Sequence, residues 1–248
     1  MTRFPFYPPE RRRLYEVYAA DYSFETPASV PWMPLRRDLR DCKIALLTTS
    51  GVRPKAAPPL GLAEIRPIPV ADLARELAFD LDGLDVADAR RDLNVLLPVD
   101  PVIDSVEKRR VRELDEDALS LVGSIDDAAA LERSAAECAD RLRDRAVDAV
   151  LLVAAGHRCN QTAGLVARQL ERAGLSTICL VTIREVAQAL RLPRAAFINF
   201  PFGRPFGPAF VSPLHRQISG DLLDALRRLD RPGKIVDLPY AWQAPATA

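Results

Sequence analysis

The stretch VDAVLLVA at residues 147–154 decides the fold class. It is an almost uninterrupted apolar run, and it ends in the small and polar residues Ala155-Gly156-His157-Arg158-Cys159. An apolar run of this length that stops at small polar residues is typical of a strand buried on both faces of a parallel sheet. Residues 160–173 follow with apolar side chains at helical spacing, and Gly174 suits the end of that helix. Strand, loop and helix in this order predict one unit of an α/β fold.

The same pattern occurs in the first half of the chain, where KIALLT at residues 43–48 is followed by Thr49-Ser50-Gly51. Further buried strands are expected at 118–125, 176–182 and 195–200, an edge strand at 63–68, and helices at 70–79, 100–112, 126–145 (with Asp126 and Asp127 as caps) and 215–228. The echo predicts two similar α/β lobes, at 41–125 and 126–248, each with a parallel sheet flanked by helices, and an active cleft between them. Residues 1–40 are expected to form an extended arm rich in proline and aromatic residues. Chance likeness between unrelated strands is the simpler alternative for the echo.

The composition is that of an ordinary globular protein without net charge. The 248 residues include 34 Lys plus Arg and 34 Asp plus Glu, so charge gives no reason to expect nucleic acid or an anionic membrane as a partner. No apolar run reaches the roughly 18–20 residues that span a bilayer, and the first residues lack the apolar core of a signal peptide. A cytoplasmic protein with reduced thiols is expected. Four cysteines without a CxxC pair, together with two histidines, predict neither a disulfide framework nor a metal site.

The loop after the strand at 147–154 carries the strongest candidates for chemistry. Cys159 stands between a strand and a helix, where backbone N–H groups and the helix dipole favour a thiolate, and His157 and Arg158 add positive charge. We predict Cys159 as a nucleophile or redox thiol, with His157 either tuning it or donating a proton. The substrate-binding groups are expected to be Thr48, Thr49, Ser50, Gly156, Arg158, Asn160, Gln161, Thr162 and Arg204. The plainer interpretation is a buried structural cysteine, a loop histidine and a helix-capping Asn160.

Three blocks of sequence, in order, carry a family resemblance. They are WMPL at 32–35 leading to KIALLTTSGV at 43–52, DARRDLNVLLPVD at 88–100, and the strand at 147–152 leading to CNQT at 159–162. Together they resemble the selenoprotein B family, the B components of glycine, sarcosine, betaine and D-proline reductases. The resemblance implies reductive cleavage of a C–N bond, with no cofactor in this chain and a pyruvoyl group on a partner subunit. In that family the redox loop carries selenocysteine, or cysteine in its place, a few residues before a second cysteine; alignment on Cys159 puts Gly156 at that position.

Three functions are open on these residues. The first is a thiol-dependent oxidoreductase acting on a small amino-acid-like or carboxylate substrate. The second is a cysteine-dependent racemase or lyase, although a symmetric racemase needs a thiol from each lobe and the first lobe offers Thr49 or Ser50. The third is a non-catalytic binding or structural subunit that lost the selenol. An oligomer is expected, because PFGRPF at 201–206 has the Phe and Pro residues favoured at interfaces; the same loop could instead bring Arg204 to an anion.

Overall fold

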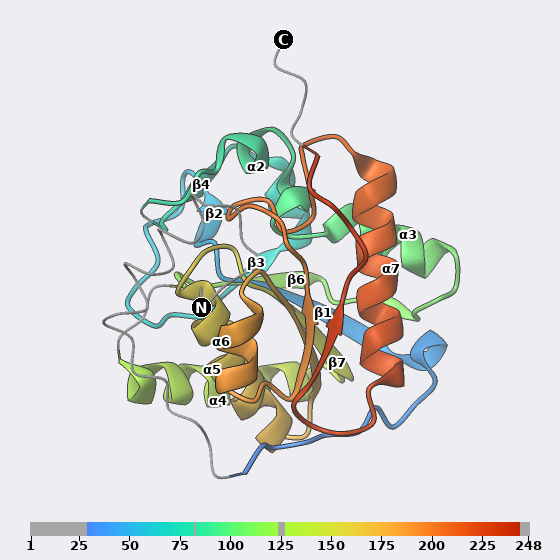
Figure 1. Cartoon of the computed structure of the whole chain (residues 1–248). Coiled ribbons are helices and arrows are strands. Elements are labelled where there is room, and N and C mark those ends of the chain that lie inside the picture. The colour runs from blue at the N-terminus through green and yellow to red at the C-terminus, as the bar shows by residue number, and fades with distance from the viewer. Residues whose placement is uncertain (1–28, 82, 124–126, 244–248) are drawn as a thin grey trace, which may run out of the picture.

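The computed structural model describes residues 29–81, 83–123 and 127–243. One sheet of eight strands runs through this part of the chain in the order β10-β9-β8-β7-β1-β6-β3, with β5 also beside β1 (Figure 1). The strands are β1 (Lys43–Thr48), β3 (Arg66–Pro69), β5 (Glu113–Leu114), β6 (Asp117–Ser120), β7 (Ala149–Val153), β8 (Ser176–Val181), β9 (Arg194–Phe197) and β10 (Lys234–Asp237). Neighbouring strands are parallel, except that β3 runs antiparallel to β6 at one edge. The predicted α/β class with a mostly parallel sheet is confirmed.

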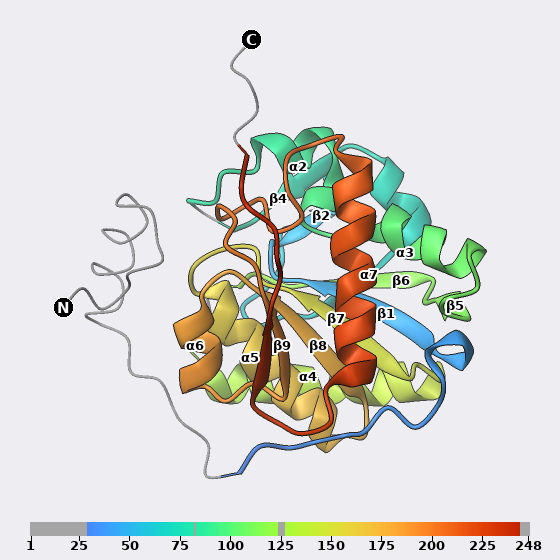
Figure 2. The same ribbon diagram turned by 45° about the vertical axis from the view of Figure 1, so that its right-hand side comes forward.

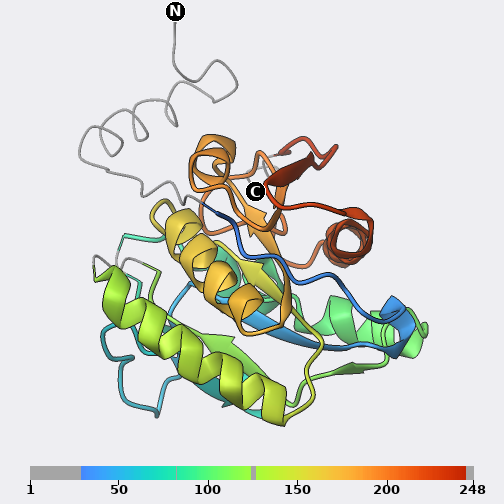
Figure 3. The same ribbon diagram turned by 90° about the horizontal axis from the view of Figure 1, so that it is seen from below.

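Helices cover both faces of this sheet (Figures 2 and 3). On one face, α4 (Ala128–Asp144) and α5 (Cys159–Arg172) lie side by side; on the other, α3 (Val99–Glu107) packs against α7 (Ser212–Arg228). Because successive side chains of a strand point to opposite faces, Leu47 and Leu152 join the core under α4 and α5, whereas Leu46 and Leu151 join the core under α7. The shorter helical elements are α2 (Ala87–Arg91), α6 (Arg184–Ala189) and the 3-10 turns η1 (Leu39–Asp41), η2 (Val70–Ala74) and η3 (Leu93–Val95).

A buried ion pair attaches the start of the described chain to the body. Arg194 on β9 and Glu171 on α5 are 1% and 3% exposed, and Arg194 Nη1 lies 2.6 Å from Glu171 Oε1. The Met33 N–H donates to Glu171, Arg194 Nη2 donates to the Met33 carbonyl (2.7 Å), and the guanidinium lies 3.5 Å from the centre of the Trp32 ring. Trp32 and Met33 therefore pack on the body; residues 1–28 of the expected arm lie outside the described residues.

Predictions that depend on a single helix agree better with the structure than predictions for a segment that pairs with a distant strand. The cap prediction for α4 is confirmed, since the Asp127 side chain accepts the Ala130 N–H (2.8 Å); Asp126 lies outside the described residues. The helix expected at 70–79 is wrong: only η2 is helical, and Leu77–Phe79 form strand β4. The spacing of Leu73 and Leu77 imitates a helix face, but pairing with β2 (Val52–Pro54) makes this segment extended.

The expected arrangement of two lobes with a cleft between them is not confirmed. β1, from the first expected lobe, pairs in parallel with β7, from the second, along five residue pairs. The two halves thus contribute to one continuous sheet. The loops after β1 and β7 still open on the same side, because parallel neighbours end at the same edge.

The carboxyl edge of the sheet is covered by the chain between β1 and α3. β2 and β4 form a small antiparallel sheet, and the Asp80 N–H donates to the Gly51 carbonyl (3.0 Å), which places β4 just beyond the end of β1. This small sheet and α2 lie together at the top of Figure 1. Among the described helices, none combines the length and the apolar character that a membrane crossing requires.

Candidate functional site

The loops after β1 and β7 are joined by the hydroxyl of Thr49. Thr49 Oγ1 donates to the Val153 carbonyl (3.1 Å) and accepts the Ala155 N–H (3.0 Å). The Thr49 N–H also donates to the Val153 carbonyl (3.1 Å). The side chain that was expected to bind substrate therefore fixes the loop that leads to Cys159, and its hydrogen bonds are satisfied within the protein.

Cys159 is the first residue of α5, and its thiol faces the loop after β1. The side chain is buried, with 1% of the residue exposed, and Sγ lies 3.6 Å from the Thr49 carbonyl oxygen. Burial raises the pKa of the thiol, although hydrogen bonds with Thr49 and with the Gly156 and Ala155 backbone act in the opposite direction. The expectation of a lowered pKa is therefore wrong: the desolvation of a buried anion outweighs the N–H groups at the start of the helix.

Two glycines define the space around the sulfur. A Cβ built on Gly123 would lie 2.4 Å from Cys159 Sγ and 2.8 Å from the Thr49 carbonyl oxygen, so only glycine fits there. A Cβ built on Gly156 would lie 3.5 Å from the same sulfur, which is an ordinary contact. Position 156, where the resemblance expects selenocysteine, thus lies directly beside the Cys159 thiol.

Apolar and acidic side chains from the segment before α2 and its first turn lie over this loop. A Cβ on Gly156 would meet the ends of Leu84 (3.3 Å) and Leu81 (3.7 Å). We use "the cover" for Leu81, Leu84, Asp85 and Asp88. The cover is tied down by Arg204, whose guanidinium lies 2.8 Å from an Asp85 oxygen and 2.6 Å from an Asp88 oxygen. Arg204, expected as a substrate contact, is engaged by these two carboxylates.

The backbone next to Arg204 holds the loop and the cover together. The Gly203 N–H donates to the Ala155 carbonyl (2.7 Å). Gly203 has a φ of +80°, and a Cβ there would lie 2.1 Å from the Asp85 carbonyl oxygen, so this close approach requires glycine. Sequence reasoning missed Gly123, Leu81, Leu84 and Asp85, because each reaches the thiol only through tertiary packing. Asp88, however, belongs to the 88–100 block that carried the resemblance.

His157 is half-buried and neutral at ordinary pH. Its ring makes an edge contact with Phe202, with the ring centres 6.0 Å apart. Burial, helped by the charge of Arg158, lowers the pKa of His157 to about 4. The expectation that His157 adds positive charge near Cys159 is therefore wrong near pH 7. With so low a pKa, His157 is a weak base near pH 7 and is not present there as an imidazolium proton donor.

The other expected binding residues have structural partners, with one exception. Asn160 Oδ1 accepts the Thr182 N–H (2.9 Å), and its amide donates to the Gly156 carbonyl (2.8 Å). Thr162 Oγ1 donates to the Gly123 carbonyl (2.8 Å), and the Thr48 hydroxyl donates to that of Ser50 (3.0 Å). Gln161 differs, because its side-chain Oε1 is buried without a hydrogen-bond partner among the described residues.

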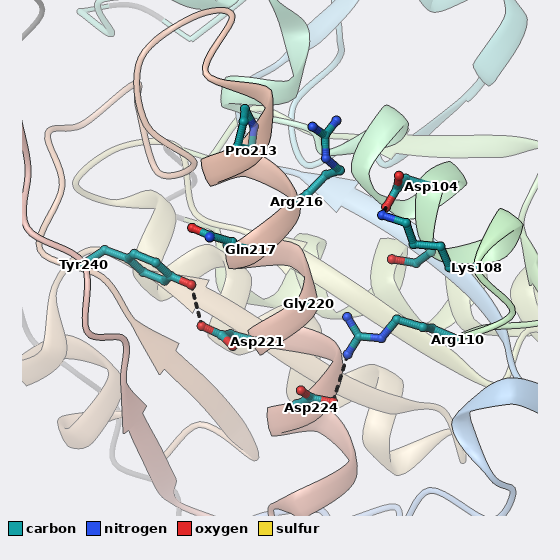
Figure 4. Close-up of a pocket in the computed structure, with 11 residues that line it drawn as sticks. Asp104, Lys108, Arg110, Pro213, Arg216, Gln217, Gly220, Asp221, Asp224 and Tyr240 are labelled. Carbon is teal, nitrogen blue, oxygen red and sulfur yellow. Dashed lines mark hydrogen bonds and ion pairs between the residues drawn. The ribbon is translucent and has the colours of Figure 1, made fainter.

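Two cavities lie elsewhere in the described part of the chain. One, of about 550 Å³, lies between α3 and α7 (Figure 4). Its charged groups largely neutralise one another: Lys108 pairs with Asp104 (2.7 Å), Arg110 pairs with Asp224 (3.1 Å), and the Tyr240 hydroxyl donates to Asp221 (2.7 Å). The other, of about 410 Å³, lies between α2 and β4. Neither is lined by Cys159, and no group of three or more candidate metal ligands occurs among the described residues.

Comparison with known proteins gives a consistent set of relatives. Residues 72–155 match the family model described as glycine/sarcosine/betaine reductase selenoprotein B. The D-proline reductase subunit gamma of Acetoanaerobium sticklandii is 30% identical over 223 residues, which cover 88% of this chain and 92% of that protein. The glycine reductase complex component B subunit gamma of Symbiobacterium thermophilum is 26% identical over 78% of this chain. The betaine reductase complex component B subunit beta of Peptoclostridium acidaminophilum is 25% identical over 68% of it.

The relatives differ in how much of them this chain spans. It covers nearly all of the D-proline reductase subunit, but 48% of the glycine reductase subunit and 41% of the betaine reductase subunit. All three are named as subunits of reductases. No solved structure matches the chain.

Proposed function

Since the chain belongs to the glycine/sarcosine/betaine reductase selenoprotein B family, we propose that it is a B-type subunit of a multi-component reductase that acts on a small amino-acid-like or carboxylate substrate. The observation that carries the proposal is the 30% identity to a D-proline reductase subunit along 92% of that subunit's length. The placement of Cys159 at the carboxyl edge of the sheet supports it, because ligands of α/β proteins bind at that edge.

In this proposal Cys159 is the redox thiol of the chain. Reduction of a C–N bond takes two electrons, and two thiols deliver them by forming one disulfide. All four cysteines of the chain are free thiols, and Gly156 brings no sulfur to Cys159. The second thiol or selenol would therefore come from a partner subunit. A pyruvoyl group on a partner, which the resemblance implies, stays a prediction of the same kind.

The neighbouring residues would act when the cover lifts. The unused oxygen of Gln161 and the Arg158 guanidinium are the groups we assign to the substrate. Arg204 would reach a carboxylate only after leaving Asp85 and Asp88. Neutral His157 is assigned to tuning the thiol as a neighbour, because its pKa of about 4 lies too far below the raised pKa of the buried thiol for it to take the thiol's proton. Thr48, Thr49, Ser50, Asn160 and Thr162 are assigned to holding Gly156 and the thiol in place.

A second candidate is a non-catalytic subunit that keeps the fold for assembly. It is favoured by the 1% exposure of Cys159 together with its raised pKa, since a thiolate is the reactive form of cysteine.

One substitution separates the two functions. Cys159→Ser, assayed in the complex assembled with its natural partner subunits, is expected to abolish substrate reduction, because a hydroxyl replaces the redox sulfur. Gel filtration should show that the variant still assembles with its partner subunits. Cys42→Ser is the matched control: Cys42 is equally buried, and its sulfur donates to the backbone carbonyls of Asp38 and Arg37, away from the loop at 155–159. Full activity of the Cys159→Ser complex would refute the redox role and leave the assembly role.

A further inference from the structure

The cavity between α2 and β4 combines an apolar floor with a basic rim. Its floor is made by Leu73, Leu77, Ala89 and Leu93, and its rim carries Arg75, Arg90 and Arg91 together with Glu76, whose carboxylate pairs with Lys55 (2.7 Å). The three arginines are exposed, whereas Leu73 is 8% exposed. A surface of this kind suits a ligand that has both an apolar group and negative charge.

The three rim arginines differ in how closely a carboxylate approaches them. Arg75 pairs with Asp72 (3.0 Å). For Arg91 the nearest carboxylate oxygen, on Asp88, is 3.7 Å away, and Asp88 is held more closely by Arg204. Arg90 lies over the Phe79 ring, 5.7 Å from its centre, and forms no ion pair with the described residues. The rim therefore offers positive charge that is only partly compensated, most of all at Arg90, on a chain whose total charge is zero.

The strand beside this cavity has an open edge. The Lys55 N–H donates to the Glu76 carbonyl (2.7 Å) and the Asp80 N–H to the Gly51 carbonyl. Residues 76 and 80 of this antiparallel pair thus face β2, and the alternation of hydrogen bonds turns the backbone groups of Leu77 and Phe79 outward. Among the described strands, none pairs with that outer edge of β4.

An exposed aromatic residue stands next to the rim. Phe210 is 62% exposed and has a φ of +65°, a strained conformation for a bulky side chain. Its N–H donates to Asp92 (2.8 Å), and the Arg91 guanidinium lies 5.1 Å from its ring centre. Val211 beside it is 38% exposed. The protein thus holds an apolar side chain in water in a fixed position, as expected of a binding anchor.

We propose that this surface docks an extended segment of a partner subunit that alternates acidic and apolar side chains. An apolar side chain enters the cavity over Leu73, Leu77 and Leu93, carboxylates meet Arg90 and Arg91, and the segment's backbone pairs with the outer edge of β4. A neighbouring apolar side chain packs on Phe210. The inference rests on the proposed function only in taking the occupant to be another subunit.

Charge argues against a second copy of this chain as the occupant. In a symmetric dimer the same surface meets itself, so the positive rims of the two copies would be brought together. A lipid surface would use the arginines but would leave the outer edge of β4 unpaired. The acidic and apolar protein segment is the occupant that uses the floor, the rim and the strand edge together.

The probe for the test is a fluorescein-labelled peptide of sequence Glu-Leu-Asp-Val-Glu-Leu-Asp-Val, titrated with the full chain and followed by fluorescence anisotropy. Saturable binding is expected, with no binding of the peptide in which lysine replaces each acidic residue. The double substitution R90E/R91E should weaken binding by about tenfold or more, because it reverses the charges that the carboxylates meet. Phe210→Ser should weaken peptide binding several-fold. The control variant is Arg133→Glu, at an exposed position of α4, and it should leave peptide binding unchanged.

Hydrogen exchange tests the proposed backbone pairing separately from the charge interactions. The amides of Leu77 and Phe79 should gain protection when the peptide is bound, and circular dichroism should show that each variant is folded. The proposal is overturned if no binding occurs up to about 1 mM peptide, if the lysine peptide binds equally well, or if the two amides gain no protection. Binding to phosphatidylserine vesicles without peptide binding, or dimerisation that R90E/R91E abolishes, would also overturn it. None of these measurements uses the reductase activity, so they stand apart from the test on Cys159.

Discussion

Arg204→Met should expose the Cys159 thiol to reagents that the native protein excludes. The substitution keeps most of the apolar stem of Arg204 but removes the guanidinium that ties the cover to the loop at 201–204. Asp88 is largely buried, with 13% of its side chain exposed, whereas 57% of the Asp85 side chain is exposed. The pair with Asp88 should therefore contribute most, about 2 kcal/mol for a charge-assisted hydrogen bond, and the pair with Asp85 little.

If the free energy that holds the cover over the loop falls by about 2 kcal/mol, the fraction of molecules with the cover open rises roughly thirtyfold. If opening is fast compared with alkylation, the labelling rate of Cys159 follows that population. The assay is brief treatment with iodoacetamide, followed by peptide mapping of all four cysteines. In the native protein Cys159 should still label faster than Cys42, Cys138 or Cys179, because its burial depends on a cover held by side-chain ion pairs.

Arg110→Met is the matched control, since Arg110 pairs with Asp224 on the opposite face of the sheet. It should leave the labelling of Cys159 unchanged. An unchanged rate in Arg204→Met would refute the reasoning about the cover. Equal acceleration at Cys138, which is buried under α4, would show general destabilisation instead.

Three further predictions concern stability. Glu171→Gln should lower the free energy of unfolding by about 3–5 kcal/mol, because it leaves the Arg194 charge buried without its partner. Asp237→Asn, which removes the exposed pair with Arg184, should lower it by at most about 1 kcal/mol. Urea unfolding measures both, and similar losses would contradict the assigned role of burial. Gly123→Ala should cost about 1–3 kcal/mol through the clash with Cys159 Sγ, whereas Gly156→Ala should change the melting temperature little, and the reverse order would show that the space beside the sulfur is wrongly described. The folded pKa of His157 lies at about 4, below its ordinary 6.5, so its contribution to stability is present above pH 6.5 and is lost as the pH falls toward 4; His157→Gln should therefore flatten the decline of the melting temperature over that range, and an undiminished decline would argue against the lowered pKa.

Local patterns in the sequence predicted most of the sheet. The strands near 43–48, 148–154 and 177–182 are apolar runs that end in small polar residues, and Asp127 is a cap that acts on its own helix. The strand at 77–79 was not predictable in this way, because its three residues become extended only by pairing with Val52–Pro54. The short helix at 184–189 and the edge strand at 234–237 have too few residues to show a period.

The candidate site was also predictable only where its residues are neighbours in the chain. Cys159, His157 and Asn160 lie on one loop and one helix start, as their order in the chain predicts. The environment of the thiol does not follow from that order, because Leu84, Gly123 and Arg204 come from distant segments. Those distant residues bury the sulfur and reverse the expected direction of its pKa shift.

The position of β1 also has a consequence for how the chain reaches its native state. β1 is the first strand of the described chain, yet its long partner, β7, begins more than a hundred residues later, at Ala149. During synthesis on the ribosome, β1 must wait with one edge unpaired until the second half has emerged, and such long-range pairing slows folding. A fragment that ends near residue 125 would keep that edge open permanently, and we expect it to aggregate rather than fold as an independent unit.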